Sequence, residues 1–455
     1  MTFLFARKFA SKAGIDRAVR WSLLNQIMRL ATGPVTMILM LWYLTPEMQG
    51  YSYAFGSVLA VSIFLELGFS QNILQFASHE FSKLNLTPER RLQGDEVAMS
   101  RLTSLARLSF KYYAIAALLF FIGTSVGGAW FFRTSQNVGV AWQLPWLLAC
   151  IASSGSLVMN PCWALLEGCN QIAEIERFRC WASSITFGLT VVTYISGFGL
   201  FVGPAVALMG LGISCLYLFW HWRGFFKNFL CKPRHGVISW RHEIWPFQWR
   251  IGVSWMSGYL LFSIVIPIIF RQVGPVAAGK YGFTMALVNA VAGASGSWSR
   301  TKLPKYGMLV AREDWVSLRT LWRRATAHSL LFAALGSVAM ITIVTVMGPF
   351  FPQLEHRYAG ALIATLLSAC MVLQNFVNSC AYILRAFKKE PYMWLSVTGA
   401  ILNAVLIWFS TRQWGITGSA VGFMLCNLII LYPAYWIFRT KQLQFMNGVS
   451  LLGRS

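Results

Sequence analysis

The stretch LTPEMQGYSYAF, residues 44–55, interrupts a long apolar run with a proline, a glutamate and a glycine before the apolar run resumes. Proline has no backbone N–H and glycine tolerates positive φ, so Pro46 and Gly50 predict a tight turn between two helices. A shift of 229 residues places residues 273–283 on residues 44–54, with Pro275 and Gly279 at the equivalent positions. The same interhelical turn is therefore expected twice in the chain.

Other parts of the chain repeat in the same order. Residues 70–74 fall on 299–303, residues 160–167 on 378–385 at an offset of 218, and residues 203–206 on 418–421. Their common order and nearly constant offset predict two halves of six spans each. Six is an even number, so both halves enter the membrane from the same side and are related by an axis along the membrane normal. We predict an N-terminal lobe at 1–225, a cytoplasmic linker at 226–244 and a C-terminal lobe at 245–455, with a cavity between the lobes.

The composition is that of a membrane protein. Of the 455 residues, 56% are hydrophobic and only 12% are charged, about half the charged fraction of a soluble domain. Apolar segments of roughly 20 residues, long enough to cross a bilayer as a helix, recur along the whole length. The fold class is therefore predicted as an all-α polytopic membrane protein with about 12 transmembrane helices in two six-helix lobes. The spans are predicted at 21–43, 52–77, 108–132, 142–166, 181–200, 203–222, 246–270, 277–298, 327–348, 360–384, 392–410 and 415–438.

The basic residues fix a predicted orientation and account for the net charge of +23. Of the 38 Lys and Arg, 31 lie at the termini and in alternate loops or the span ends beside them, 5 lie in or beside the remaining loops, and 2 lie deeper inside spans. Because loops on the cytoplasmic side are enriched in Lys and Arg, both termini are predicted to be cytoplasmic. The charge needs no nucleic-acid partner, and some attraction to anionic membrane lipids is expected.

Nothing in the sequence indicates an enzyme. The nine cysteines are scattered without a CxxC pair or a Cys/His cluster, so neither a metal site nor a cofactor is predicted. No P-loop, no HExxH and no large external loop is present, so ATP is not expected to drive the protein directly.

Two arginines lie inside predicted spans. Arg29 lies about two turns into the first span, with Asn25 on the same helix face, and Arg250 begins a polar line in the seventh span. Because the guanidinium group binds phosphate oxygens in pairs and stays charged, a pyrophosphate site is one interpretation. The alternative to a pyrophosphate site is that these side chains extend to the cytoplasmic membrane–water interface or pair with a carboxylate. Arg300 lies at the predicted cytoplasmic mouth and could gather an anionic head group.

One carboxylate lies deep in a span. Glu66 occurs in FLELGFS, with Ser62 and Ser70 on its helix face, whereas the repeat-related position is Ser295. Burial raises a carboxyl pKa, so Glu66 could couple transport to a proton or sodium gradient. The alternative is that Glu66 is a structural partner of Arg29.

The stretch at 43–80 resembles the polysaccharide flippases of the multidrug/oligosaccharidyl-lipid/polysaccharide exporter superfamily. The resemblance is carried by L-x-P-E-x-x-G at 44–50, by Glu-Leu-Gly-Phe-Ser at 66–70 and by residues 245–262. It implies flipping of an oligosaccharide linked to undecaprenyl pyrophosphate across the bacterial inner membrane, for O-antigen and lipopolysaccharide synthesis. The chain is expected to work as a monomer. Glycan polymerase and chain-length proteins are the partners that the resemblance suggests.

Other functions remain open at this stage. A drug or cation antiporter has the same fold, but a cavity with Arg29 and Arg250 is a poor host for a cation. A membrane glycosyltransferase or polymerase would need an external catalytic loop, which is not present. A non-transport scaffold in glycan assembly is a further alternative.

Overall fold

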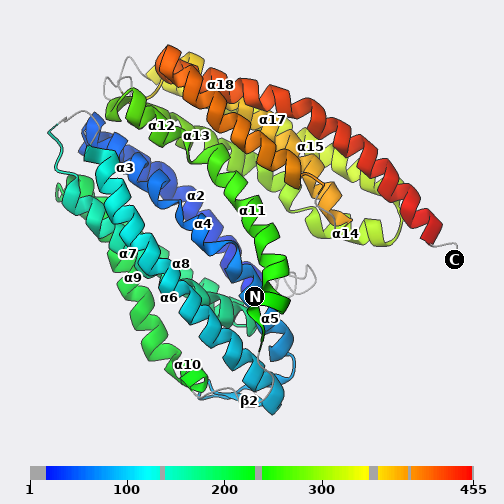
Figure 1. Cartoon of the computed structure of the whole chain (residues 1–455). Coiled ribbons are helices and arrows are strands. Elements are labelled where there is room, and N and C mark those ends of the chain that lie inside the picture. The colour runs from blue at the N-terminus through cyan, green and yellow to red at the C-terminus, as the bar shows by residue number, and fades with distance from the viewer. Residues whose placement is uncertain (1–16, 134–138, 231–237, 348–356, 388–390, 453–455) are drawn as a thin grey trace, which may run out of the picture. The chain divides into compact units, whose positions relative to one another are not determined.

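The computed structural model describes residues 17–133, 139–230, 238–347, 357–387 and 391–452, which are almost entirely helical (Figure 1). The chain divides into two compact units. Unit 1 is the chain up to Leu44 together with Val58–Met256, and unit 2 is Thr45–Ser57 together with the chain from Ser257 onward. Residues 45–57, which the sequence assigns to the N-terminal lobe, thus belong to unit 2.

Unit 1 consists of long helices and one short β-hairpin. Helix α6 packs along α7, α7 packs along α5 and α9, and α2 packs along α8. In the hairpin, β1 and β2 are antiparallel, with Leu84 opposite Gly94 and Leu86 opposite Leu92. The elements are α2 (Arg17–Tyr43), α4 (Ser62–Glu66), α5 (Phe69–Phe81), β1 (Leu84–Leu86), β2 (Leu92–Gly94), α6 (Glu96–Arg133), α7 (Gln143–Gly168), α8 (Ile172–Ile195), the 3-10 turn Gly199–Phe201, α9 (Val202–His221), α10 (Arg223–Lys227), the 3-10 turn Asn228–Leu230, the π-helical turn Trp240–Ile244 and most of α11 (Trp245–Phe262).

Aromatic side chains fill the core of unit 1. Phe69, at the start of α5, is fully buried, lies parallel to the ring of Tyr113 at 5.9 Å and meets Tyr112 edge-on at 4.9 Å. Aromatic pairs in these geometries stabilise a core beyond their buried area. They hold the start of α5 firmly against the middle of α6.

Unit 2 is a helical bundle. Helix α13 packs against α12, α15 and α17, and α17 and α18 pack along each other. Its elements are α3 (Pro46–Leu59), of which all but the last two residues lie in this unit, α12 (Val265–Gln272), α13 (Pro275–Arg300), α14 (Leu303–Ala311), α15 (Trp315–Met347), α17 (Ala361–Ala386) and α18 (Met393–Leu452). α18 contains two helical stretches joined at Trp414 and Gly415, whose backbone is not helical.

Within the described residues each predicted span lies mostly in helix, so the prediction of an all-α polytopic membrane fold is confirmed. Among the described residues, seven helical stretches are long and apolar enough to cross a membrane. They are Pro46–Glu66, Glu96–Arg133, Gln143–Gly168, Gly199–His221, Trp315–Val346, Ala361–Ala386 and Met393–Lys441.

The turn predicted around LTPEMQG is shorter than the sequence suggests. Helix α2 ends at Tyr43 and α3 begins at Pro46, so Gly50 lies inside a helix and the prediction that it forms part of the turn is wrong. Proline at the first position of a helix loses no hydrogen bond, because the first N–H groups have no helical partner. The second copy behaves in the same way: Gly274, at φ 119°, precedes Pro275 and Gly279 lies inside α13.

The glycines have a packing role. A Cβ atom on Gly50 would lie 1.9 Å from the carbonyl oxygen of Pro275, and one on Gly279 would lie 2.9 Å from the backbone nitrogen of Gly50. The two repeat-related helix starts therefore contact each other backbone to backbone within unit 2. Only glycine permits this approach, which explains the Pro-x-x-x-Gly spacing better than a turn does.

Two of the predicted spans are broken. The span predicted at 52–77 is divided into α3, α4 and α5, and the span predicted at 246–270 is divided into α11 and α12 at residues 263–264. Leu67 (φ 47°) and Gly68 (φ 66°) separate α4 from α5 in the left-handed region. Breaks of this kind free backbone polar groups, which in a membrane protein are tolerated where protein or a cavity receives them.

Candidate functional site

Broken transmembrane helices commonly form the binding sites of secondary transporters, because their ends present unpaired carbonyl and N–H groups. In this chain each unit contains one such break next to polar side chains: the α4–α5 break in unit 1 and the α11–α12 break in unit 2.

In unit 1 the break surrounds Glu66. The Ser70 hydroxyl donates a hydrogen bond of 2.6 Å to Glu66 Oε1, and the Tyr113 hydroxyl lies 3.4 Å from the same oxygen. The Tyr112 hydroxyl donates to the carbonyl of Leu65 at 2.6 Å, a backbone acceptor in the last turn of α4. Neighbouring hydroxyls from α5 and α6 thus fix both the carboxylate and the broken backbone beside it.

The Glu66 side chain is half-buried and forms no ion pair with any described side chain. Among the described side chains, the hydroxyl groups of Ser70 and Tyr113 are the only ones that bond this carboxylate. Carboxylates in transmembrane segments are rare and mark ion or substrate pathways. The role of Glu66 in coupling transport to an ion gradient remains a prediction.

Asn25 lies in a different network. It is buried, and its Nδ2 donates to Glu176 Oε2 at 3.1 Å, while its Oδ1 has no partner among the described residues. Glu176 also accepts from Arg179 at 2.8 Å, and Arg179 reaches Glu167 at 2.6 Å. Asn25 therefore extends an ion-pair network between α2, α7 and α8.

The three predicted arginines lie on three different helices. The backbones of Arg29 and Arg250 lie in α2 and α11, both in unit 1, and their side chains lie outside the described part of the structure. Arg300 is exposed at the last residue of α13 in unit 2. Their assignment to a pyrophosphate site remains a prediction.

In unit 2 the break between α11 and α12 is supported from α18. Asn403 is fully buried, and its Nδ2 donates to the carbonyls of Leu260 and Leu261 at 3.3 and 3.1 Å. The last four carbonyls of a helix have no intrahelical partner, and both of these belong to that group. Asn403 therefore satisfies the end of α11 and fixes the chain where the helix stops.

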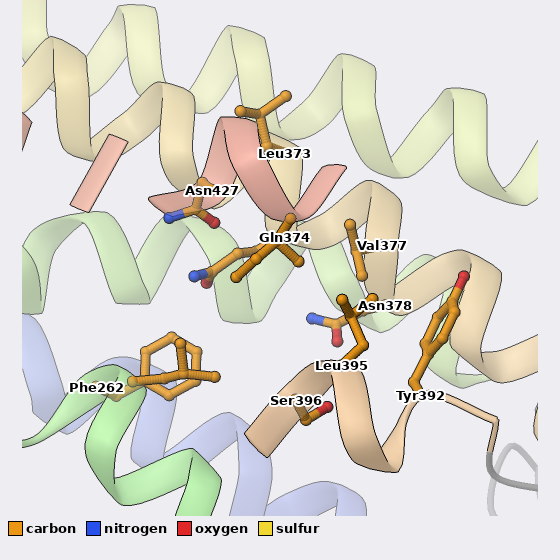
Figure 2. Close-up of a pocket in the computed structure, with 11 residues that line it drawn as sticks. Phe262, Leu373, Gln374, Val377, Asn378, Tyr392, Leu395, Ser396 and Asn427 are labelled. Atoms are coloured by element: carbon orange, nitrogen blue, oxygen red, sulfur yellow. The ribbon is translucent and has the colours of Figure 1, made fainter. Parts of the chain in front are cut away.

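A cavity of about 150 Å³ lies beside this end of α11. Its polar lining consists of the carboxamides of Gln374 and Asn378 on α17, the carboxamide of Asn427 on α18 and the Ser396 hydroxyl (Figure 2). We call this space the amide cavity. Its full lining is Leu261, Phe262, Leu373, Gln374, Val377, Asn378, Tyr392, Leu395, Ser396, Asn427 and Ile430.

Sequence reasoning did not select the residues of the amide cavity. A signal for them exists, because Gln374 and Asn378 are four residues apart and share one face of an otherwise apolar span. Charged residues inside the spans are the signal used to predict the site, and carboxamides, which are polar but uncharged, do not give that signal. Asn427 and Phe262 had no such signal, because only the packing of α11, α17 and α18 brings them to the same space.

Polar contacts also join α3 to the rest of unit 2. Gln49 is buried, its Nε2 donates to the carbonyl of Gly279 at 3.1 Å, and its Oε1 accepts from Arg357 Nη1 at 3.1 Å. Burial lowers the pKa of Arg357, and the nearby charge of Glu47 opposes this shift. Gln49, which belongs to the stretch 44–55, therefore helps to hold a buried arginine in place. Among the described residues, no group of three His, Cys, Asp or Glu side chains could hold a metal ion.

Solved structures of two kinds share this fold. An inward-facing multidrug resistance MATE family transporter of the MOP superfamily is 14% identical, with 93% of this chain and 96% of that chain covered and a TM-score of 0.60. The lipid II flippase MurJ, in an inward closed conformation, is 12% identical, with 95% and 90% covered and a TM-score of 0.66. An outward-facing MATE family transporter is 15% identical, with 94% and 96% covered and a TM-score of 0.53.

No family model and no curated protein matches the chain. The structural likeness, which extends over nearly the whole length of each chain, shows that this is a multi-pass membrane protein with the fold of the MATE transporters and MurJ.

Proposed function

We propose that the chain is a secondary transporter that flips a lipid-linked oligosaccharide from the cytoplasmic to the outer leaflet by alternating access, for surface polysaccharide synthesis. The carrier lipid in this proposal is undecaprenyl pyrophosphate, and the membrane is the bacterial inner membrane with both termini in the cytoplasm. The observation that carries the proposal is the charge inside the predicted spans, where Arg29 and Arg250 accompany only one deep carboxylate, Glu66.

Charge inside a membrane is costly and is retained where it meets a substrate or a cavity. Two arginines that stay ionised favour an anionic group, and a pyrophosphate provides paired oxygens for each guanidinium fork. Arg300, exposed at the end of α13, would gather the anionic head group at the cytoplasmic mouth.

Asn25 has a smaller part in the proposal than the arginines. Its Nδ2 already donates one hydrogen to Glu176, and its Oδ1 is an acceptor, as phosphate oxygens are. Asn25 could meet a pyrophosphate only through the second hydrogen of Nδ2 or through a bridging donor.

The neighbouring structures support two functions of this fold. The name of MurJ states that it flips lipid II, and the MATE proteins are named as multidrug resistance transporters. The site of Glu66, with its hydroxyl neighbours, favours the second candidate function, an ion-coupled multidrug antiporter. The two functions differ in the charge of the cargo and can be separated by experiment.

The test uses the full chain in liposomes with a fluorescent lipid-linked pyrophosphoryl oligosaccharide, whose exposure is read with a membrane-impermeant quencher. The flippase proposal expects accelerated flipping in the wild type and loss of flipping by at least about tenfold in Arg29→Ala and Arg250→Ala, since each removes a charge-assisted hydrogen bond. Normal flipping in both variants would contradict the pyrophosphate clamp. Exchange of a cationic dye for protons, without lipid flipping, would instead support the antiporter.

A further inference from the structure

We propose that the amide cavity of unit 2 binds one uncharged sugar ring of the transported glycan and so selects among glycans. This inference rests on the proposed function, because it supplies the recognition of the sugar that the arginines cannot provide. Four observations carry it: the size of the cavity, its hydrogen-bonding groups, its lack of charge and its rigid frame.

The size of the cavity suits a single ring. An engineered cavity of about 150 Å³ in another protein holds benzene, a six-membered ring. The amide cavity has about the same volume, 150 Å³. A pyranose is also a six-membered ring, whereas a whole oligosaccharide or a polyprenyl chain would not fit. The cavity would therefore take one sugar of the chain and leave its neighbours outside.

The polar groups of the cavity match hydroxyl groups. A carboxamide has two donor hydrogens and an acceptor oxygen, so it can both give and receive hydrogen bonds with adjacent hydroxyls. The side chains of Gln374, Asn378 and Ser396 form no hydrogen bond with a described residue. Asn427 uses Nδ2 to reach the Phe423 carbonyl at 2.8 Å, which leaves its Oδ1 as an acceptor. Figure 2 shows the three carboxamides turned toward the space between α11, α17 and α18.

The lining also defines what the site does not bind. None of the described residues that line the cavity is charged, so neither a cation nor a phosphate has a counter-charge there. The ring of Phe262 and the ring of Tyr392 contribute flat apolar faces, which suit the C–H face of a sugar. A group with hydroxyls at its edge and C–H groups on its face fits this lining better than an ion or a purely apolar chain.

Hydrogen bonds within the protein, which do not use the groups that would face a ligand, hold the residues around the cavity in place. Tyr392 donates its hydroxyl to the Ala434 carbonyl at 2.7 Å, so its ring cannot swing away. Asn403 holds the carbonyls of Leu260 and Leu261 and thereby fixes the end of α11 next to Phe262. A pre-organised site loses less entropy on binding. It also discriminates strongly, because a ligand that lacks a hydroxyl leaves a polar group of the site unpaired.

The test compares two lipids in the liposome flipping assay: the lipid-linked oligosaccharide and undecaprenyl pyrophosphate without sugar. Asn378→Leu and Gln374→Met keep side-chain volume and remove the hydrogen-bonding groups. Each is expected to slow flipping of the glycan lipid by at least about tenfold relative to the sugar-free lipid. Gln413→Met is the matched control, because Gln413 is exposed on α18 outside the cavity. Equal losses for both lipids, or no loss for either, would overturn the proposal.

A second measurement separates this inference from the proposed function. Saturation-transfer NMR on the full chain in detergent, with a panel of uncharged methyl glycosides, detects sugar contact without transport. Contact in the wild type that is lost in Asn378→Leu but kept in Gln413→Met supports the site even if neither lipid is flipped. If the wild type contacts no glycoside of the panel, the site is refuted even where flipping of the lipid occurs.

Discussion

Two helical hairpins occupy equivalent places in the repeat, the first at residues 17–81 and the second at residues 245–300, and they differ in which helix is broken. In the first hairpin α2 is continuous and its partner is divided into α3, α4 and α5. In the second hairpin the leading helix is divided into α11 and α12, and α13 is continuous over 26 residues. The repeat therefore preserves the Pro-x-x-x-Gly helix start and places the break elsewhere.

The position of the break decides which polar group becomes available. Glu66 lies at the α4–α5 break, whereas the equivalent Ser295 lies within the continuous α13. Ser295 is buried, and its hydroxyl donates to the Ala292 carbonyl and accepts from Asn375. The two breaks therefore differ in the polar groups beside them: the break in unit 1 has a carboxylate and the break in unit 2 has carboxamides.

The largest expected effect comes from breaking the feature that both hairpins share. Gly50→Ala would place a methyl group 1.9 Å from the Pro275 carbonyl oxygen, and a backbone atom cannot move aside as a side chain can. We expect destabilisation on the order of 3 kcal/mol or more, at the upper end for overpacking. The measurement is the thermal midpoint of the detergent-solubilised protein, followed by size-exclusion chromatography after heating.

Gly56→Ala is the matched control for this prediction. Gly56 lies in the same helix, α3, and a Cβ atom there meets nothing within 4 Å. The control should be neutral or slightly stabilising, because alanine favours a helix over glycine. Similar midpoints for the two variants would show that the backbone contact between the two hairpins does not form.

A second prediction concerns a polar contact that only the first hairpin has. Gln49 bonds both Gly279 and Arg357, whereas the equivalent residue in the second hairpin is Ala278. Gln49→Leu should cost about 2 kcal/mol, since it takes one hydrogen-bond partner from a buried arginine and one from a backbone carbonyl. Gln49→Glu keeps an acceptor for Arg357 and should recover part of this loss in the same thermal assay. No recovery would mean that the Arg357 contact contributes little.

The third prediction tests whether the difference between Glu66 and Ser295 matters for transport. Glu66→Gln retains an acceptor for Ser70 and removes the ionisable group. If Glu66 couples transport to protons, transport and the accompanying proton flux should fall by about tenfold, equivalent to ~1.4 kcal/mol. Ser295→Ala should leave proton flux within about twofold, because its hydroxyl has a structural role. Unchanged proton flux in Glu66→Gln would remove the coupling role and leave Glu66 as a structural residue.

Much of this fold follows from the sequence, because the features that determine it are local. Runs of apolar residues of membrane length predict helices, and each of the predicted spans lies mostly in helix within the described residues. The breaks could not be predicted in this way. The run through 60–68 contains no proline, and at its division the Tyr112 hydroxyl of α6 bonds the Leu65 carbonyl, a contact that only tertiary packing provides.

The candidate site was predictable in part, for the same reason. An intramembrane charge such as Glu66 can be identified from the sequence. The packing role of a glycine cannot, because it depends on which residue lies against the glycine in the folded structure. Gly50 was assigned to a turn because glycine permits positive φ, but its function is to let Pro275 approach. The carboxamides of the amide cavity come from two helices, and only tertiary packing brings them together with Phe262.

The smallest expected effect lies where the first hairpin ends. Arg101 of α6 bonds two carboxylates, each at 2.8 Å: Glu80 in the last turn of α5 and Glu243 just before α11. In the second hairpin the residue equivalent to Glu80 is Leu309, which cannot form an ion pair. The Ser239 N–H, and then Arg101, lower the pKa of Glu243 below its usual value of 4.5. A carboxylate with a lowered pKa in the folded state contributes stability above its unfolded pKa and loses it as the pH falls through the folded pKa.

Acidification below about pH 4.5 should therefore lower the thermal midpoint of the wild type through this group, by no more than the ~1 kcal/mol typical of a partly exposed pair. Glu243→Gln should be less stable than the wild type at neutral pH and should approach it at low pH, since both then have an uncharged group at this position. Asp314, whose pKa is lowered by the Ser317 side chain and backbone N–H, provides the control: Asp314→Asn should leave the dependence due to Glu243 intact. A constant difference between wild type and Glu243→Gln across this pH range would show that the end of the first hairpin is held by packing, as at Leu309, and that the ionic contact adds nothing to it.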